Sequence, residues 1–202
     1  RFAFSYRDAE TWQPDPITNF NNTTIAAGLA ALTEQAHDMA PAEGLATFIF
    51  PNSSLTTALP SATTEIAKIK SFVGAGHSNA EDILEPVTAL IGLGPGLTPS
   101  GDDFLGGIMI ALNLLEEVEK CRVLASAVEN AASVTNDISR AHLNAAARGV
   151  GAEPLHATIG DVISNRNHVL KASLERLDAI GHCSGWDALT GVVITLRAWL
   201  AE

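Results

Sequence analysis

The sequence has few of the features that identify several common classes of protein. Its 202 residues include only two cysteines, Cys121 and Cys183, which favours free thiols and a reducing, cytoplasmic location over a disulfide framework. Twelve Lys and Arg stand against 23 Asp and Glu, and the net charge of −11 argues against nucleic acid and anionic membranes as partners. The most apolar stretch, 104–115, is too short to span a bilayer.

The composition also argues against disorder and against a structural metal. Charged residues make up 17% and hydrophobic residues 47%, whereas disorder requires high charge and low hydrophobicity. No C-x-x-C, H-E-x-x-H or calcium-loop pattern is present. The mean hydropathy of +0.18 is high, and it predicts apolar surface that is used on other subunits or on a second copy of the chain.

The chain is predicted to be mainly α, a multi-helix single domain with a short N-terminal extended or β segment. Residues 1–20 alternate and then break at prolines, which predicts an extended arm, and because the first residue is Arg1 we expect a truncated N-terminal region. Residues 21–202 form the predicted helical domain, with a possible strand at Thr47–Phe50. The expected helices cover 22–39, 42–50, 62–74, 79–91, 101–119, 121–134, 136–149, 154–165, 167–180 and 185–201.

Two predicted helix starts, 84 residues apart, share the frame S-G-x-D-x-L-x-G. One begins at Ser100 and the other at Ser184. The match is too short to establish a duplicated domain. If the two helices pack with their N-termini together, their positive dipole ends would face one pocket that is suited to an anion. The alternative is two well-capped core helices that cross at glycines.

Within this frame, each serine is predicted to cap its helix, with the acid three residues later closing a capping box. These acids are Asp103 and Asp187, which we therefore expect to be structural. Gly101 and Gly185 carry no side chain that would shield their N–H groups, so together with the two serines they are predicted to bind the anion.

The segment 92–103 is rich in glycine and leads into the first of these helices. Gly94, Gly96 and Thr98 are predicted to cradle a phosphate or carboxylate, since such loops present several N–H groups. No Lys follows the last glycine, and no clear strand precedes the loop. A Walker A loop and a dinucleotide-binding fingerprint are therefore both disfavoured.

Three residues at the helix starts are candidates for chemistry. Asp102 has no capping duty in the frame, so it is predicted to be a general acid or base, or a ligand for Mg²⁺; its alternative is a solvated acid in the first turn. His182 is a second candidate for moving a proton, with a plain turn residue as its alternative. Cys183 is a weaker nucleophile candidate and more commonly a small packed residue.

An arginine could complete the anion site. Arg140 follows the polar segment Thr135–Ser139 at a predicted helix start, and it is predicted to clamp a carboxylate or phosphate. Arg148 lies eight residues further along and is expected to be an ordinary surface arginine.

Three segments together resemble the AllH-like family. They are G-L-G-P-G-L-T-P-S-G-D-D-F-L-G-G at 92–107, T-N-D-I-S-R with the following A-A-R-G within 135–149, and G-H-C-S-G-W-D at 181–187. The resemblance covers about 90–195. It implies a role beside two other subunits in an oxamate carbamoyltransferase of allantoin breakdown, which interconverts oxalurate plus phosphate with oxamate plus carbamoyl phosphate.

The resemblance and the residues lead to one expected function and two alternatives. The chain is expected to be a carbamoyltransferase subunit that binds an anionic small molecule, such as carbamoyl phosphate or oxalurate, at paired helix N-termini. The first alternative is a non-catalytic scaffold subunit whose glycines serve helix packing. The second is a Mg²⁺-dependent phosphotransferase that uses Asp102; the leading hypothesis needs no cofactor.

Overall fold

The described part of the chain is built from helices. The computed structural model describes residues 12–14, 16–17, 20–50, 59–76 and 80–201. Within these ranges it has no strand and confirms the mainly α prediction. The α-helices are α1 (Asn22–Ala36), α2 (Ala62–Val73), α3 (Ala80–Leu90), α4 (Ser100–Leu114), α5 (Val118–Ala131), α6 (Asp137–Ala146), α7 (Glu153–Ile163), α8 (Asn167–Asp178) and α9 (Ser184–Trp199), and the 3-10 helices are η1 (Ala46–Ile49) and η2 (Ala132–Val134).

The region 42–50 differs from its prediction. It forms only the four-residue η1, so both the longer helix and the possible strand over 47–50 are wrong. Gly44 interrupts the chain with a φ of +69°, and the Leu45 N–H donates to the Asp187 carboxylate at 2.6 Å. A tertiary contact with α9 therefore fixes this segment, and local helix propensity does not.

The predicted N-terminal arm is described only in part. The alternating stretch before residue 12 lies outside the described residues, and the described positions between 12 and 20 belong to no helix or strand. The Trp12 ring lies 5.4 Å from the His156 ring of α7. The arm therefore contacts the helical domain at that point, while the proposed boundary after residue 20 stays a prediction.

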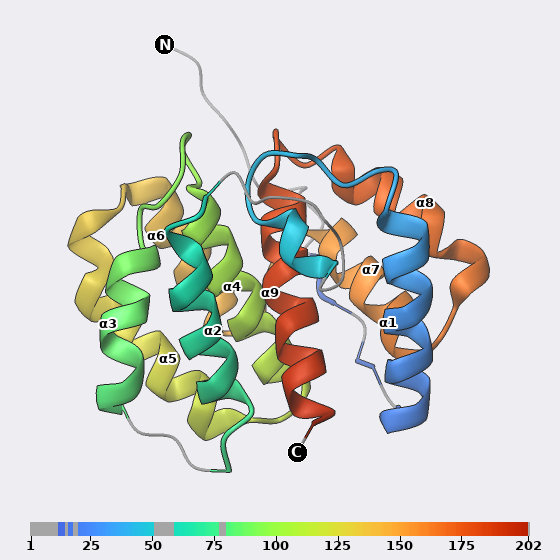
Figure 1. Ribbon diagram of the computed structural model, residues 1–202, viewed down its shortest axis with the longest axis horizontal. Helices are drawn as coiled ribbons and strands as arrows, with labels where there is room; N and C mark the ends of the chain where they lie inside the picture. Colours follow the sequence, from blue (N-terminus) through green and yellow to red (C-terminus); the bar gives the residue numbers. More distant parts are fainter. Residues whose placement is uncertain (1–11, 15, 18–19, 51–58, 77–79, 202) are drawn as a thin grey trace.

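The helices α4 and α9 form the centre of the molecule (Figure 1). They are the most extensively packed pair of helices, and every residue from Phe104 to Leu112 is buried. In Figure 1, α2, α3, α5 and α6 lie on one side of this pair, and α1, α7 and α8 lie on the other. Among the described helices, none has both the length and the apolarity needed to cross a membrane.

Two glycines allow α4 and α9 to cross at very short range. A Cβ at Gly107 would lie 1.9 Å from the Ala188 carbonyl oxygen, and a Cβ at Gly191 would lie 2.1 Å from the Phe104 carbonyl oxygen. No side chain can occupy either position without moving the backbone of the other helix. The two contacts exchange equivalent positions of the repeated frame, so the crossing has an approximate twofold axis.

The approximate twofold relation extends beyond the crossing. The order α1, η1, α2, α3, α4 is repeated as α5, α6, α7, α8, α9. Here α6 packs on α4 while η1 packs on α9, and α3 packs against α5 while α8 packs against α1. The correspondence is incomplete, because α6 has ten residues and η1 only four. The short sequence echo therefore marks the centre of a larger structural repeat.

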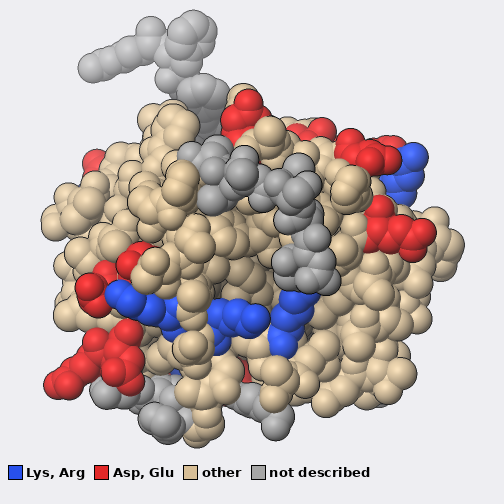
Figure 2. Space-filling view, in the orientation of Figure 1, with Lys and Arg blue, Asp and Glu red and all other residues tan. Residues whose placement is uncertain are grey.

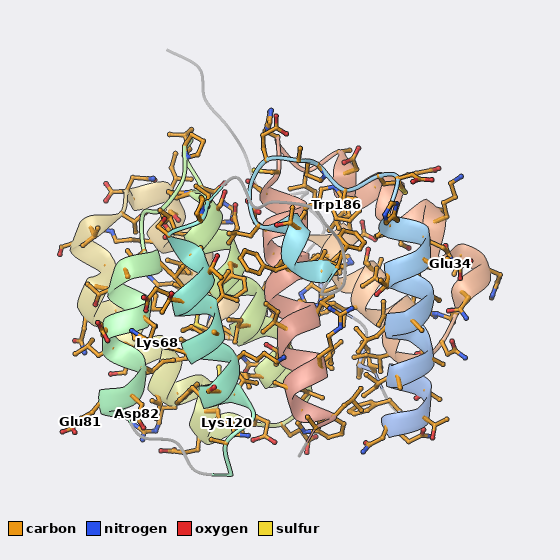
Figure 3. The ribbon with its side chains drawn as sticks, viewed as in Figure 1. Glu34, Lys68, Glu81, Asp82, Lys120 and Trp186 are labelled. Carbon is orange, nitrogen blue, oxygen red and sulfur yellow. The ribbon has the colours of Figure 1, made fainter. Side chains whose placement is uncertain are left out.

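Charge is distributed unevenly on the face seen in Figure 2. Acidic side chains lie mainly toward the edges of this face, while Lys and Arg form a band across its middle. Lys68 of α2, labelled in Figure 3, pairs with Glu65 at 3.2 Å and with Glu85 of α3 at 3.0 Å. These carboxylates raise the pKa of Lys68, so at least this cation is neutralised locally.

Candidate functional site

The structure brings the two repeated helix starts together, as the sequence predicted. Thr98 Oγ1 lies 2.8 Å from Ser184 Oγ, and Ser100 Oγ lies 3.8 Å from Cys183 Sγ. These pairs join segments more than 80 residues apart. The N-terminal ends of α4 and α9 therefore share one small region of the molecule.

The predicted capping boxes are wrong. The helix α4 starts at Ser100 itself, with Pro99 as its N-cap, and α9 starts at Ser184, with Cys183 as its N-cap. Neither helix has a hydrogen bond from a capping side chain. Because each serine lies inside the first turn, its hydroxyl is free to face the neighbouring helix.

The frame instead connects each serine with the acid of the other helix. The Ser184 hydroxyl faces the Asp103 carboxyl and lowers its pKa, while the Ser100 hydroxyl does the same for Asp187. These contacts are exchanged across the approximate twofold axis, like the glycine contacts at the crossing. The repeated acids thus hold the two helix starts against each other, and they do not cap their own helices.

The prediction that Gly101 presents an open N–H group is also wrong. This N–H donates to the Leu93 carbonyl at 2.9 Å. A Cβ at this position would lie 2.0 Å from the Leu90 carbonyl oxygen. Gly101 is therefore required by the close approach of the end of α3, a packing role that needs no ligand.

Gly185 has the equivalent role at the start of α9. Its N–H points to the Ile180 carbonyl at 3.4 Å, and a Cβ there would lie 2.4 Å from the Leu177 carbonyl oxygen of α8. The end of α8 approaches α9 as the end of α3 approaches α4. Gly185 also borders a cavity, so its proposed part in binding stays a prediction.

The glycines of the loop have different positions. Gly94, with a φ of +110°, lies against the start of α4, where a Cβ would be 2.9 Å from the Ser100 nitrogen. Gly96, with a φ of +97°, is exposed, and no atom lies within 4 Å of the position of its missing Cβ. Both glycines permit the turn, and their contact with an anion stays a prediction.

A cavity of about 510 Å³ opens beside the paired helix starts. Its walls come from α4, α6, α7 and α9 and from the turns before α4, α7 and α9, and they are mostly apolar. The polar residues that line it are Thr98, Asp102, Asp103, Ser139, His142 and Ser184. This is a volume and lining suited to a small organic molecule.

Asp102 lines this cavity with a carboxylate that is already occupied by protein donors. It is 2% exposed, and it accepts hydrogen bonds from the Gly92 N–H at 2.7 Å, the Thr135 hydroxyl and the Ser139 hydroxyl at 2.5 Å. It thereby ties the loop before α4 to the start of α6. The geometry favours a positioning role, and the predicted catalytic or Mg²⁺-binding role has no support from these contacts.

Asp103 has the more reactive environment of the two acids. Its Oδ2 atom is buried without a hydrogen-bond partner. Burial raises the pKa of Asp103 to about 7, with further increases from Asp187 and Asp102, against the opposing hydroxyls of Ser184 and Thr98. A carboxyl that exchanges its proton near neutral pH and lines a cavity is a candidate acid or base.

Asp187 is the counterpart of Asp103 and is fully buried. Its Oδ1 accepts from the Leu45 N–H at 2.6 Å, its Oδ2 has no hydrogen-bond partner, and burial raises its pKa. Burial and the Asp187 charge raise the pKa of Cys183 to about 12. Cys183 therefore remains a thiol at neutral pH, which argues against its role as a nucleophile.

The remaining candidates do not line this cavity. His182 is exposed in the turn before α9 and is not among the residues that line the cavity. Arg140 pairs with Asp137 and borders a different groove between α5 and α6. Arg148 borders a third cavity, near α7. The structure thus does not bring Arg140 to the paired helix starts, and His182, although it lies in the turn next to the start of α9, does not line the cavity.

A metal site receives no support from the described residues. Within the described ranges, no three His, Cys, Asp or Glu side chains are grouped so that they could hold a metal ion. The possible use of Mg²⁺ stays a prediction without a donor set in that part of the chain.

The sequence analysis treated the repeated acids Asp103 and Asp187 as local caps, and the structure shows no such cap at either helix. The repeat itself contained the signal, since Asp103 and Asp187 occupy the same frame position in two helices that meet. Trp186, which aligns with Asp102, is 1% exposed and donates from Nε1 to Asp178 at 2.7 Å; Figure 3 shows it near the beginning of α9. Asp102 and the aligned Trp186 thus each bind a neighbouring helix, α6 and α8 respectively.

The fold and site define an all-α protein with a small-molecule cavity at the meeting point of two related helices. The family model for oxamate carbamoyltransferase subunit AllH matches residues 90–196, just over half of the chain, and the chain belongs to this family. The matched range includes both repeated helix starts and the helices that enclose the cavity. No solved structure matches the chain.

Proposed function

We propose that this chain is a subunit of an oxamate carbamoyltransferase and that the cavity beside α4 and α9 binds its carbamoyl-bearing substrate. The family supports the enzyme class and implies that other subunits accompany the chain. The observation that carries the assignment of the site is Asp103, a carboxyl with a pKa of about 7 in the wall of this cavity.

The reaction needs a group that moves one proton. When phosphate attacks the ureido carbonyl of oxalurate, a C–O bond forms and the bond between that carbon and the oxamate nitrogen breaks. The departing nitrogen must receive a proton, and Asp103 supplies it as the general acid. In the opposite direction, the ionised Asp103 accepts the proton that the oxamate nitrogen loses as it attacks carbamoyl phosphate. Asp103 therefore takes the role that the sequence suggested for Asp102 or His182.

The helix starts supply polar groups for the anionic parts of the substrate. Thr98 and Ser184 hydroxyls lie in the cavity wall and contact each other at 2.8 Å. Such donors, together with the positive ends of two helix dipoles, stabilise negative charge that develops on the carbonyl oxygen during transfer. Gly185 lines the same cavity, and Gly94 packs against the first residue of α4.

The direct test is the activity of the assembled enzyme with an Asp103→Asn subunit. We expect kcat to fall about 100-fold or more, because an amide cannot transfer the proton. Asp161→Asn is the matched control. Asp161 is also buried, and it accepts a hydrogen bond of 2.6 Å from the Ser173 hydroxyl, but it does not line the cavity. Unchanged kcat in the Asp103→Asn enzyme would contradict the proposed site.

The pH dependence gives a second test of the same role. Oxalurate cleavage requires protonated Asp103, whose pKa is about 7. We therefore expect kcat for cleavage to decrease about tenfold per pH unit well above neutral pH. A kcat that stays constant to pH 9 would assign the proton transfer to another group.

A scaffold subunit is the second candidate, because packing accounts for much of the motif. Gly101, Gly107, Gly185 and Gly191 all make room for carbonyl oxygens of neighbouring helices. Exposed apolar side chains, including Leu97 at 66%, offer surface for other subunits. Full activity of the Asp103→Asn enzyme together with failed assembly of a Leu97→Asp subunit would favour the scaffold.

A further inference from the structure

His142 of α6 is a polar side chain in the wall of the cavity beside the paired helix starts. It is exposed, and among the described residues none forms a hydrogen bond or an ion pair with its imidazole. Other polar groups of the wall have protein partners, since Ser139 donates to Asp102 at 2.5 Å and Thr98 contacts Ser184 at 2.8 Å. The imidazole nitrogens of His142 are therefore available to a ligand.

The way the start of α6 is held determines the position of His142. Asn136 caps this helix and accepts from the N–H groups of Ile138 and Ser139 at 3.0 and 3.1 Å. The Ser139 hydroxyl donates to Asp102 of α4, which ties this turn of α6 to the cavity wall. His142 lies three residues after Ser139, so both side chains are on the same face of the helix. The fold thus fixes the backbone that carries His142 and leaves its ring open to the cavity.

The polar groups that a ligand could use come from two places in the cavity wall. Thr98, Asp103 and Ser184 lie together at the paired starts of α4 and α9, whereas His142 lies on α6. Much of the remaining wall is made of apolar or small residues, including Ile110, Ala146 and Leu155. A ligand that matches this wall therefore carries two polar groups.

The titratable groups of the wall differ in what they can offer to a carboxylate. Within the described part of the chain they are Asp102, Asp103 and His142. Asp102 already accepts from three protein donors, and an acid offers a carboxylate a like charge. An imidazole instead donates an N–H to a carboxylate. His142 is therefore the titratable side chain of this wall that favours a carboxylate.

We propose that His142 is the specificity-determining residue of this cavity and donates a hydrogen bond to the carboxylate of the substrate. The assignment rests on the proposed function, because oxalurate and oxamate both carry a carboxylate next to an amide carbonyl. The nitrogen that exchanges its proton with Asp103 lies on one side of this carbonyl, and the carboxylate that His142 binds lies on the other. His142 thereby selects acids over neutral amides of the same shape.

The test compares oxamate with oxamide as acceptors of the carbamoyl group from carbamoyl phosphate in the assembled enzyme. Oxamide has an amide in place of the carboxylate and is otherwise the same molecule. For the wild type we expect a higher kcat/KM with oxamate. In His142→Leu, which removes the donor, the ratio of the two kcat/KM values should fall about tenfold or more, mainly through a higher KM for oxamate.

Two further variants separate the hydrogen bond from a change in packing. His142→Gln keeps an N–H donor and should restore part of the preference for oxamate. His168→Leu is the matched control, because His168 is exposed on α8 and does not line the cavity, and it should leave the ratio unchanged. A ratio that is equal in the wild type and in His142→Leu, or a loss confined to kcat, would overturn the proposal.

The Asp103→Asn enzyme distinguishes this proposal from the proposed function. It should lower kcat for both acceptors and leave their ratio unchanged, because Asp103 moves a proton and does not recognise the carboxylate. A lost preference in His142→Leu together with full kcat in Asp103→Asn would support His142 and contradict Asp103 as the acid. A reduced kcat in Asp103→Asn with an unchanged ratio in His142→Leu would contradict the role of His142 alone.

Discussion

The start of α4 and the start of α9 use the same sequence frame but have different surroundings. At α4, Asp103 borders a cavity of about 510 Å³, and the neighbouring Asp102 holds the start of α6 at the edge of that cavity. At α9, Asp187 is covered by η1 and receives the Leu45 N–H. One motif thus produces an open site in one half and a closed structural contact in the other. The difference comes from the segment that packs beside each helix.

The largest expected effect comes from disrupting the close crossing of α4 and α9, which relates the two helix starts. Gly107→Ala places a Cβ 1.9 Å from the Ala188 carbonyl oxygen, and we expect it to lower the free energy of unfolding by about 3 kcal/mol. Urea denaturation measures this change. Gly76→Ala is the matched control, since no atom lies within 4 Å of its Cβ position, and an equal loss in both variants would contradict the role of the crossing.

A smaller effect on stability follows from the proton that Asp103 holds. Its folded-state pKa is raised to about 7 from 3.8, so the folded chain binds more protons than the unfolded chain between these values. This contribution to stability is therefore fully present below about pH 4 and is lost as pH rises through 7. The free energy of unfolding of Asp103→Asn should therefore rise relative to that of the wild type as the pH increases. For this half-buried group we expect the difference between the two proteins to change by about 2 kcal/mol in favour of the variant between pH 4 and pH 8.

Thermal or urea unfolding at the two pH values measures the Asp103 contribution. Asp137→Asn serves as the control, because its side chain is 89% exposed and its replacement should change the pH dependence little. If the difference between Asp103→Asn and the wild type is the same at pH 4 and pH 8, Asp103 is not the group that titrates.

The smallest expected effect concerns α6, the helix beside the cavity at the start of α4. Ser139→Ala removes one of the three hydrogen bonds to Asp102, and we expect a loss of about 1 kcal/mol in the free energy of unfolding. The same variant should weaken binding of oxamate, measured by calorimetry, because α6 forms one wall of the cavity. Thr190→Val is the counterpart at the closed region, where the hydroxyl reaches the Leu45 carbonyl at 3.3 Å, and it should leave oxamate binding unchanged.

Most helices were predictable because their signals are local. The predicted starts of the two central helices, 101 and 185, each lie one residue from the observed Ser100 and Ser184. Helix periodicity and the glycines that follow the helices depend on neighbours in the chain. The region 42–50 failed because its conformation depends on Asp187, which is more than 140 residues away.

The candidate site was only partly predictable for the same reason. The meeting of the two helix starts followed from the repeated frame, and it is observed between Thr98 and Ser184. The hydrogen-bond partner of each repeated acid could not be predicted from the sequence, because Asp103 faces Ser184, a serine of the other helix. Arg140 belonged to a polar helix start in the sequence, yet its position on α6 directs it to another groove.

The sequence by itself determined the helical class, the order of the helices, the family and the pairing of the two glycine-containing helix starts. These properties depend on local propensity and on a motif that can be compared with itself along the chain. Only the tertiary structure decided which acid faces the cavity, which is covered by η1, and which glycines serve packing. The reason is that burial, and with it the pKa of a carboxyl, depends on what surrounds a side chain in three dimensions.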